Sequence, residues 1–140
     1  MLWDVGTFWP RAYHPLAPPL YAERAVPELQ RRLWYLHDHH GAAVVAAHSQ
    51  GSVIAVAALL QERSGAGNDD IGLVTFGCPL TKLYGWAFPS YFGLDRLCPR
   101  VWRWHNFYYQ TDYIGGHVFR DGTGHDTKLE GPPTSATLPD

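Results

Sequence analysis

Hydrophobic and polar positions follow a helical repeat early in the chain. Between Tyr21 and His37 the apolar residues recur at three- and four-residue steps, which predicts an amphipathic helix ending over Asp38–Gly41. Pro27 is best tolerated in the first turn of a helix, so the regular part is expected to start close to it.

Short segments that are apolar, or in the third case rich in aromatic residues after a β-branched start, follow this helix, and they predict strands of a parallel sheet. These runs are Ala42–His48, Ile71–Phe76 and the aromatic segment Val101–Tyr109. Between the first two, the Ala-rich stretch Val53–Leu60 predicts a buried helix running from near Gly51 to about Arg63. This order is typical of the α/β class. We therefore expect a three-layer, mostly parallel sheet with about three recognisable strands.

The pattern weakens at both ends and in one central segment. Residues 1–20 carry four prolines and several aromatic residues, which predicts an extended arm. Residues 21–130 are expected to form one domain, followed by a flexible tail over 131–140. The segment Pro79–Arg100 is expected to be irregular, with at most one short helical turn.

Charge and hydropathy exclude two kinds of partner. Eleven Lys and Arg residues against thirteen Asp and Glu residues give a net charge of −2, which argues against a nucleic-acid binder. The longest apolar run, Val53–Leu60, is far shorter than the roughly 20 residues that span a bilayer, so we expect no transmembrane segment. No signal-peptide pattern follows Met1, and there are only two cysteines, so a cytoplasmic location is expected.

The aromatic content is high for a small domain. Trp, Tyr and Phe make up 14% of the chain, and a domain of this size has limited interior for such rings. The excess predicts that some rings are covered by a partner domain or chain, or by missing chain.

The segment with the clearest chemistry is Ala47-His48-Ser49-Gln50-Gly51, at the junction of a predicted strand and helix. A sharp turn there exposes its middle side chain at a helix N-terminus, flanked by small residues that avoid clashes. The N–H of Gln50 could then stabilise an oxyanion beside a nucleophilic Ser49. The alternative role for Ser49 is an N-cap of a buried helix. Cys78 is expected to be a buried thiol rather than a nucleophile.

This segment and two later ones resemble the α/β-hydrolase superfamily, and within it the lipase-like serine hydrolases. Val74–Pro79 resembles the strand and Gly-x-Pro turn after the nucleophile, and Asn106–Asp112 resembles the next strand with its acid. The arm, the nucleophile elbow (the strand-to-helix turn at Ala47–Gly51) and Thr111–Gly116 further resemble hydrolase-like regions of actinobacterial membrane-associated proteins. The likeness runs from about Trp3 to Pro133, and it implies that a longer parent could be membrane-associated.

The resemblance implies a chain order of serine, acid and histidine. Asp112 then stands where the acid belongs, and its alternative role is a turn residue bonding its own backbone. His117 follows too closely to leave room for another strand. His125 is the remaining candidate base, although the true base could lie beyond the chain end. His37, His39 and His40 form no helical i, i+4 pair, so no metal is expected.

Two functions follow from these expectations. The first is a serine hydrolase acting on an ester or acyl substrate, without a metal or organic cofactor. The second is a non-catalytic hydrolase-like module that packs on a partner chain or domain.

Most of the superfamily has about eight strands, and a strand with its His is expected to be missing here, so a partial domain of little activity is predicted. Aromatic residues over Tyr84–Phe92 could line an acyl pocket, but core packing is favoured. A nucleotide-binding fold is disfavoured because no Gly-rich phosphate motif is present.

Overall fold

Helices and strands alternate along most of the chain, and the computed structural model describes residues 21–61, 70–119 and 125–131. The predicted arm over 1–20 and nearly all of the predicted tail over 131–140 lie outside the described residues. The regular elements are α2 (Tyr21–His40), β1 (Ala43–His48), α3 (Gln50–Leu60), β2 (Ile71–Phe76), a π-helical turn (Leu80–Tyr84), α4 (Gly85–Ala87), α5 (Leu94–Leu97), a 3₁₀ turn (Cys98–Arg100), β3 (Arg103–Tyr109) and β4 (His125–Leu129).

The strands form one parallel sheet in the order β1-β2-β3-β4, which confirms the predicted α/β class. The three predicted strands are present with boundaries within two residues. The expectation that the strand after the acid is missing is wrong, because β4 pairs with β3 from His105 and His125 onward. Its sequence, HDTKL, lacks the apolar run that marks a buried strand. An edge strand has one neighbour and tolerates polar residues.

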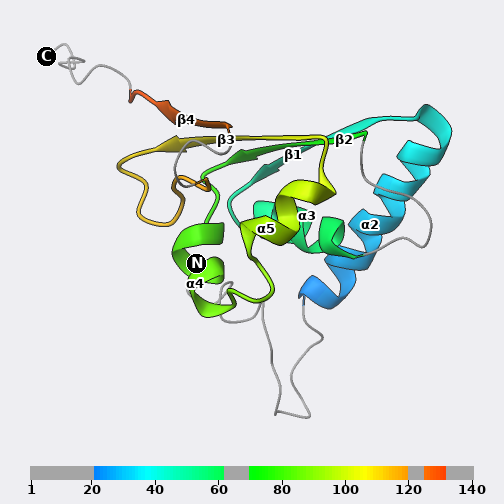
Figure 1. Cartoon of the computed structure of the whole chain (residues 1–140), viewed down its shortest axis with the longest axis horizontal. Coiled ribbons are helices and arrows are strands. Elements are labelled where there is room, and N and C mark those ends of the chain that lie inside the picture. Colours follow the sequence, from blue (N-terminus) through cyan, green and yellow to red (C-terminus); the bar gives the residue numbers. More distant parts are fainter. Residues whose placement is uncertain (1–20, 62–69, 120–124, 132–140) are drawn as a thin grey trace, which may run out of the picture.

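The described helices lie on one face of the sheet (Figure 1). Strands are added in a single direction across the sheet, so right-handed crossovers place every connecting helix on the same side. The described residues therefore supply two of the three layers we expected, namely the sheet and one helical layer. Among these residues, no helix is both long and apolar enough to cross a membrane.

The core lies between α3 and the face of the sheet that it covers. Val53 and Val56 of α3 are fully buried, and Ile71 and Leu73 of β2 are nearly so. The opposite face is open: Val44 is 72% exposed, although β1 was expected to be covered on both faces. Alternation of side chains along each strand explains this difference, because only one face meets the helices.

Two predicted helix boundaries change. α2 begins at Tyr21 and contains Pro27, whereas we expected the regular helix to start close to that proline. α3 begins at Gln50 and ends at Leu60, short of the predicted Arg63. Directly after Leu60, the Gln61 N–H bonds the Ala58 carbonyl. The helix ends there because Gln61 adopts an extended conformation.

The segment predicted as irregular holds more helix than expected, in the π-helical turn, α4, α5 and the 3₁₀ turn. Tyr84 and Phe92 from this segment pack edge to face in the core, with ring centroids 5.8 Å apart. Trp86, in contrast, is 85% exposed. The expectation of core packing therefore holds for part of the aromatic segment only.

Because helices cover only one face of the sheet, the same Val→Ala substitution should lower the free energy of unfolding by different amounts on the two faces. Val56→Ala removes two buried methyl groups beside the sheet and should lower the free energy of unfolding by about 2 kcal/mol. The matched Val44→Ala on the open face should change it by less than about 0.5 kcal/mol. Urea unfolding followed by circular dichroism measures both, and equal effects would contradict this assignment of faces.

Candidate functional site

The turn between β1 and α3 holds Ser49 in an unusual backbone conformation. Its φ is 51° and its ψ is −126°, and Ser49 is the single non-glycine residue with positive φ among the described residues. Such a conformation costs a non-glycine residue on the order of 1–3 kcal/mol and persists only where the surroundings enforce it. Strain of this kind is concentrated at functional sites.

Hydrogen bonds on both sides of the turn enforce this conformation. The Ser49 N–H donates to the Phe76 carbonyl at 2.9 Å, so the ladder from β2 extends one residue past β1. On the helix side, the Ser52 N–H bonds the Ser49 carbonyl at 2.9 Å, and the Ser52 hydroxyl bonds the Ala47 carbonyl at 3.1 Å. Ser49 itself makes no side-chain capping bond, which disfavours the N-cap role.

The residues around Ser49 differ in how far they are needed for the turn. Gln50 is the first residue of α3, so its N–H stands at the positive end of the helix dipole. Ala47 is buried, as the tight turn predicts. Gly51 is not sterically required, since a Cβ there would meet nothing within 4 Å. The expected need for a small residue at both flanking positions is therefore wrong on the helix side.

Asp112 lies just beyond the carboxyl end of β3, at the same edge of the sheet as Ser49. Its Oδ1 accepts hydrogen bonds from the N–H groups of Ile114 and Gly115, both at 2.9 Å. This is the turn role weighed as the alternative for this residue. Its Oδ2 points elsewhere: it lies 3.1 Å from the place where a Cβ of Gly77 would stand. One carboxylate oxygen therefore builds the turn, and the other faces the end of β2.

Several groups act on the Asp112 carboxylate at this edge. Partial burial by itself would raise the pKa of Asp112. The N–H groups of Gly115 and Ile114 and the charges of Lys82 and His48 outweigh burial, so the pKa falls below its ordinary value. The carboxylate is therefore held ionised.

Two glycines let these segments meet. Gly77 follows β2 with a φ of 53°, and its absent Cβ would lie 3.1 Å from Asp112 Oδ2 and 3.6 Å from His48 Nε2. A Cβ on Gly115 would overlap both the Gly77 backbone and the Asp112 carboxylate. Asp112, His48 and the residue after β2 thus converge, with Ser49 next in the chain to His48.

His125 occupies a different part of the sheet. It is the first residue of β4, at the amino end of that strand, where its ring stacks on His105 with centroids 5.7 Å apart. β4 lies three strands from β1, roughly 14 Å at the usual strand spacing. The structure therefore does not bring His125 to Ser49. His117 is exposed beyond the Asp112 turn, and its ring contacts Tyr108 edge to face.

Asp126, the second residue of β4, anchors the loop after Asp112. Its carboxylate accepts hydrogen bonds from the backbone N–H groups of Val118 and Phe119 at 2.9–3.1 Å. It also accepts one from the buried Asn106 amide at 2.7 Å. Asn106 donates a second bond, to the Gly116 carbonyl, at 3.0 Å. No pattern around Asp126 reveals this role, since it depends on pairing across β3 and β4.

Among the described residues, this edge holds neither a reactive cysteine nor a cluster of metal ligands. Cys78 is fully buried, and burial raises the pKa of its thiol to about 11, which fits the expected inert thiol. Within residues 21–61, 70–119 and 125–131, no group of three or more His, Cys, Asp or Glu side chains could hold a metal ion. Comparison with protein-family models, curated proteins and solved structures gave no match to the chain.

The close approach of Gly115 to Gly77 predicts opposite outcomes for two Gly→Ala substitutions. Gly115→Ala should lower the free energy of unfolding by about 1–3 kcal/mol, because its methyl group overlaps backbone and carboxylate. Gly51→Ala adds a methyl group in open space on a helix and should raise it by up to about 1 kcal/mol. Thermal and urea unfolding distinguish the two variants. A Gly115→Ala protein with an unchanged free energy of unfolding would contradict the observed contact.

The lowered pKa of Asp112 predicts a pH-dependent contribution to stability. The folded state binds this proton more weakly than the unfolded state, in which the pKa of the Asp112 carboxyl is about 3.8. The ionised carboxylate therefore stabilises the fold fully above that pH, and the contribution is lost as pH falls through the lower folded pKa. Asp112→Asn should be less stable than the native protein near neutral pH, and the gap should shrink as pH falls below the unfolded pKa. Urea unfolding against pH tests this, and a gap that stays constant would contradict it.

Proposed function

We propose that Ser49 is the nucleophile of a serine hydrolase of the α/β-hydrolase type, acting on an ester or related acyl substrate. The observation that carries this proposal is the positive φ of Ser49 at a strand-to-helix turn. The same strained turn presents the nucleophilic serine in that superfamily. Ser49 lies beside the helix N-terminus, makes no capping bond and is partly exposed.

The proposed reaction begins when Ser49 Oγ attacks the ester carbonyl carbon and its proton passes to an imidazole base. The carbonyl oxygen gains the negative charge, which the Gln50 N–H and the α3 dipole stabilise. The tetrahedral intermediate collapses to an acyl-serine as the leaving alcohol takes the proton from the base. Water then hydrolyses the acyl-serine and releases the acid. None of these steps calls for a metal or organic cofactor.

Asp112 is proposed as the carboxylate that orients the base. Its Oδ2 faces Gly77 and His48 at the edge that carries Ser49, and its pKa is lowered, so it stays ionised near neutral pH. These are the properties that the acid of a triad needs. Its Oδ1 is occupied by Ile114 and Gly115, which fixes the direction of Oδ2.

The base is the part of the triad that the geometry supports least. His125 is the first residue of β4, a strand that lies three strands from β1, and it stands at the amino end of that strand. We therefore leave it out of the proposed triad. His48 is the described imidazole beside Asp112. Without an imidazole placed between Ser49 and Asp112, turnover by these 140 residues is expected to be low, because a serine hydroxyl is a weak nucleophile.

The second candidate is a non-catalytic hydrolase-like module that packs on a partner. It is favoured by one observation, the open face of the sheet, where Val44, Phe76 and Tyr109 are 72%, 39% and 43% exposed. Parallel sheets are normally covered on both faces, so this face suits a contact with another domain or chain.

Chemical labelling tests the nucleophile directly. A fluorophosphonate probe added to the 140-residue protein together with free imidazole should modify one serine, since imidazole can replace a missing base. Intact-mass and peptide analysis should locate the adduct on Ser49. Ser49→Ala should abolish the adduct, whereas the matched Ser90→Ala, at another exposed serine, should leave it unchanged.

The histidine variants then separate the possible bases. His125→Ala should leave labelling unchanged, because His125 lies away from Ser49. Loss of imidazole-independent labelling in His48→Gln would identify His48 as the base. Undiminished labelling of Ser49→Ala, or no adduct on Ser49 with imidazole present, would rule out the nucleophile and favour the non-catalytic module.

A further inference from the structure

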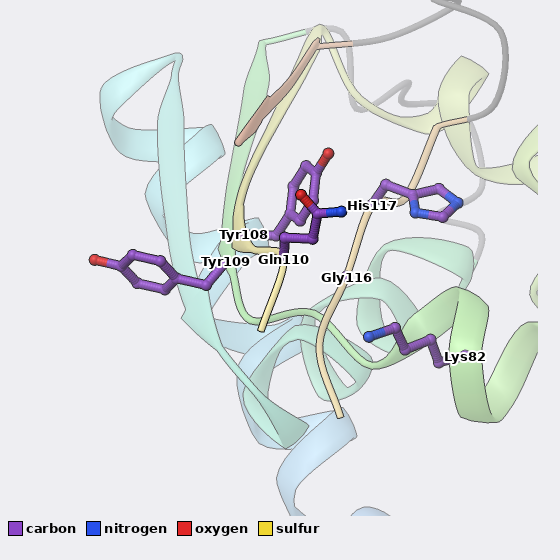
Figure 2. Close-up of a pocket in the computed structure, with 6 residues that line it drawn as sticks. All are labelled: Lys82, Tyr108, Tyr109, Gln110, Gly116 and His117. Carbon is purple, nitrogen blue, oxygen red and sulfur yellow. The ribbon is translucent and has the colours of Figure 1, made fainter. Parts of the chain in front are cut away.

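A concave site lies beside the Asp112 loop, at the carboxyl end of β3. It is a cavity of about 250 Å³ lined by Lys82, Tyr108, Tyr109, Gln110, Gly116 and His117. Figure 2 shows Lys82 and Gln110 reaching toward the 116–117 segment from two different elements, while Tyr109 points to the opposite side of the sheet. None of these residues belongs to the proposed hydrolase site.

The side chains around this cavity are donors of hydrogen bonds. Lys82 supplies an ammonium group, Gln110 an amide and Tyr108 a hydroxyl, and His117 adds an imidazole. No carboxylate is among the residues that line it. The carboxylate of Asp112 is nearby in the chain, but its oxygens face Ile114, Gly115 and the end of β2. The lining therefore carries one positively charged side chain and no carboxylate of its own.

Lys82 is exposed, and its ammonium group is tethered to the Asp112 loop. Its Nζ donates a hydrogen bond to the Asp112 backbone carbonyl at 2.6 Å. Its stem runs along Gly116, where a Cβ would lie 2.8 Å from Lys82 Cε, so a larger residue would displace the lysine. An ammonium group has three N–H donors, and the bond to Asp112 uses one. Two remain for a ligand.

The opposite wall of the cavity, the 116–117 segment, is bonded to the π-helical turn that carries Lys82. The Thr81 hydroxyl donates to the His117 carbonyl at 2.6 Å, which ties the 116–117 segment to the π-helical turn carrying Lys82. The Tyr108 and His117 rings meet edge to face, with centroids 6.3 Å apart. Within the part of the chain that the structure describes, the Gln110 amide and the Tyr108 hydroxyl make no hydrogen bond. A preformed site with unused donors costs little ordering on binding.

We propose that this cavity binds the oxyanion of a small ligand, a carboxylate or a phosphate. An ammonium group with neighbouring neutral donors forms charge-assisted hydrogen bonds to such groups, and these are about twice as strong as neutral ones. The volume is slightly below the usual range of about 300–1,000 Å³ for small-molecule sites, so the ligand is small. This proposal does not depend on Ser49 being a nucleophile.

Binding of two simple probes to the 140-residue protein tests the proposal. Inorganic phosphate and benzoate are titrated separately in a low-salt buffer, with amide chemical shifts as the readout. We expect saturable binding of at least one probe, with shifts confined to residues 82, 108–110 and 116–117. Binding of phosphate alone identifies a phosphate ligand, and binding of benzoate alone identifies a carboxylate with an apolar stem.

Variants assign the binding to this cavity. Lys82→Met should weaken binding by about tenfold or more, because it removes a charged donor. Gln110→Ala should weaken it less, by about threefold. The matched Lys128→Met removes the same charge from the exposed side of β4 and should bind as the native protein does.

Other outcomes overturn the proposal. Absence of saturable binding by both probes would do so, and so would equal weakening by Lys82→Met and Lys128→Met, which indicates general attraction to positive charge. If Lys82→Met unfolds because it loses the bond to Asp112, Gln110→Ala decides the matter. Native affinity in a folded Gln110→Ala protein, with shifts outside the cavity, would show that these donors bind no ligand.

Discussion

The register of the parallel sheet is the constraint on which the site depends. His48, Phe76 and Phe107 are level across β1, β2 and β3. β1 and β2 end side by side at this level, and β3 continues past it to Tyr109. The ladder also continues past the strands: the Ser49 N–H bonds the Phe76 carbonyl, and the Gly77 N–H bonds the Phe107 carbonyl. Each net hydrogen bond contributes about 1 kcal/mol, comparable with the strain of a positive φ at Ser49. A slip of one residue in β1 would remove the Ser49–Phe76 bond and turn every side chain of that strand to the other face.

A network of buried polar side chains links β2, β3 and β4 by hydrogen bonds. The Trp104 indole donates to the Thr75 hydroxyl, which donates to the Asn106 amide oxygen, at 3.0 and 2.8 Å. The other end of Asn106 reaches Asp126 and the Gly116 carbonyl. Because every member described here has a partner, the network positions the loop instead of destabilising the core. The loop that holds Asp112 is therefore fixed from β2, β3 and β4 together.

The sequence was sufficient for the features that depend on local chemistry. A strand, a turn at Ser49 and an Ala-rich helix could be predicted because apolar runs and small residues mark them. The placement of Asp112 at the same edge followed from strand order alone. β4 and the role of Asp126 could not be predicted, because a polar edge strand has no apolar run and its stabilising bonds come from residues far away in the chain. His125 shows the same limit: its distance from Ser49 depends on the start of a strand that the pattern did not reveal.

The Asp112 loop connects the two sites proposed for this edge. The Asp112 carboxylate faces the elbow, while its carbonyl accepts the Lys82 ammonium that lines the neighbouring cavity. An anion bound to the two remaining donors of Lys82 would offset its positive charge and so lessen its effect on the Asp112 carboxylate. Lys82 is among the charges that lower the pKa of Asp112, so such a ligand would act on the acid of the proposed triad through the charge of Lys82. Any coupling of this kind is reciprocal: a group that binds Asp112 at the elbow would change the affinity of the cavity by the same factor.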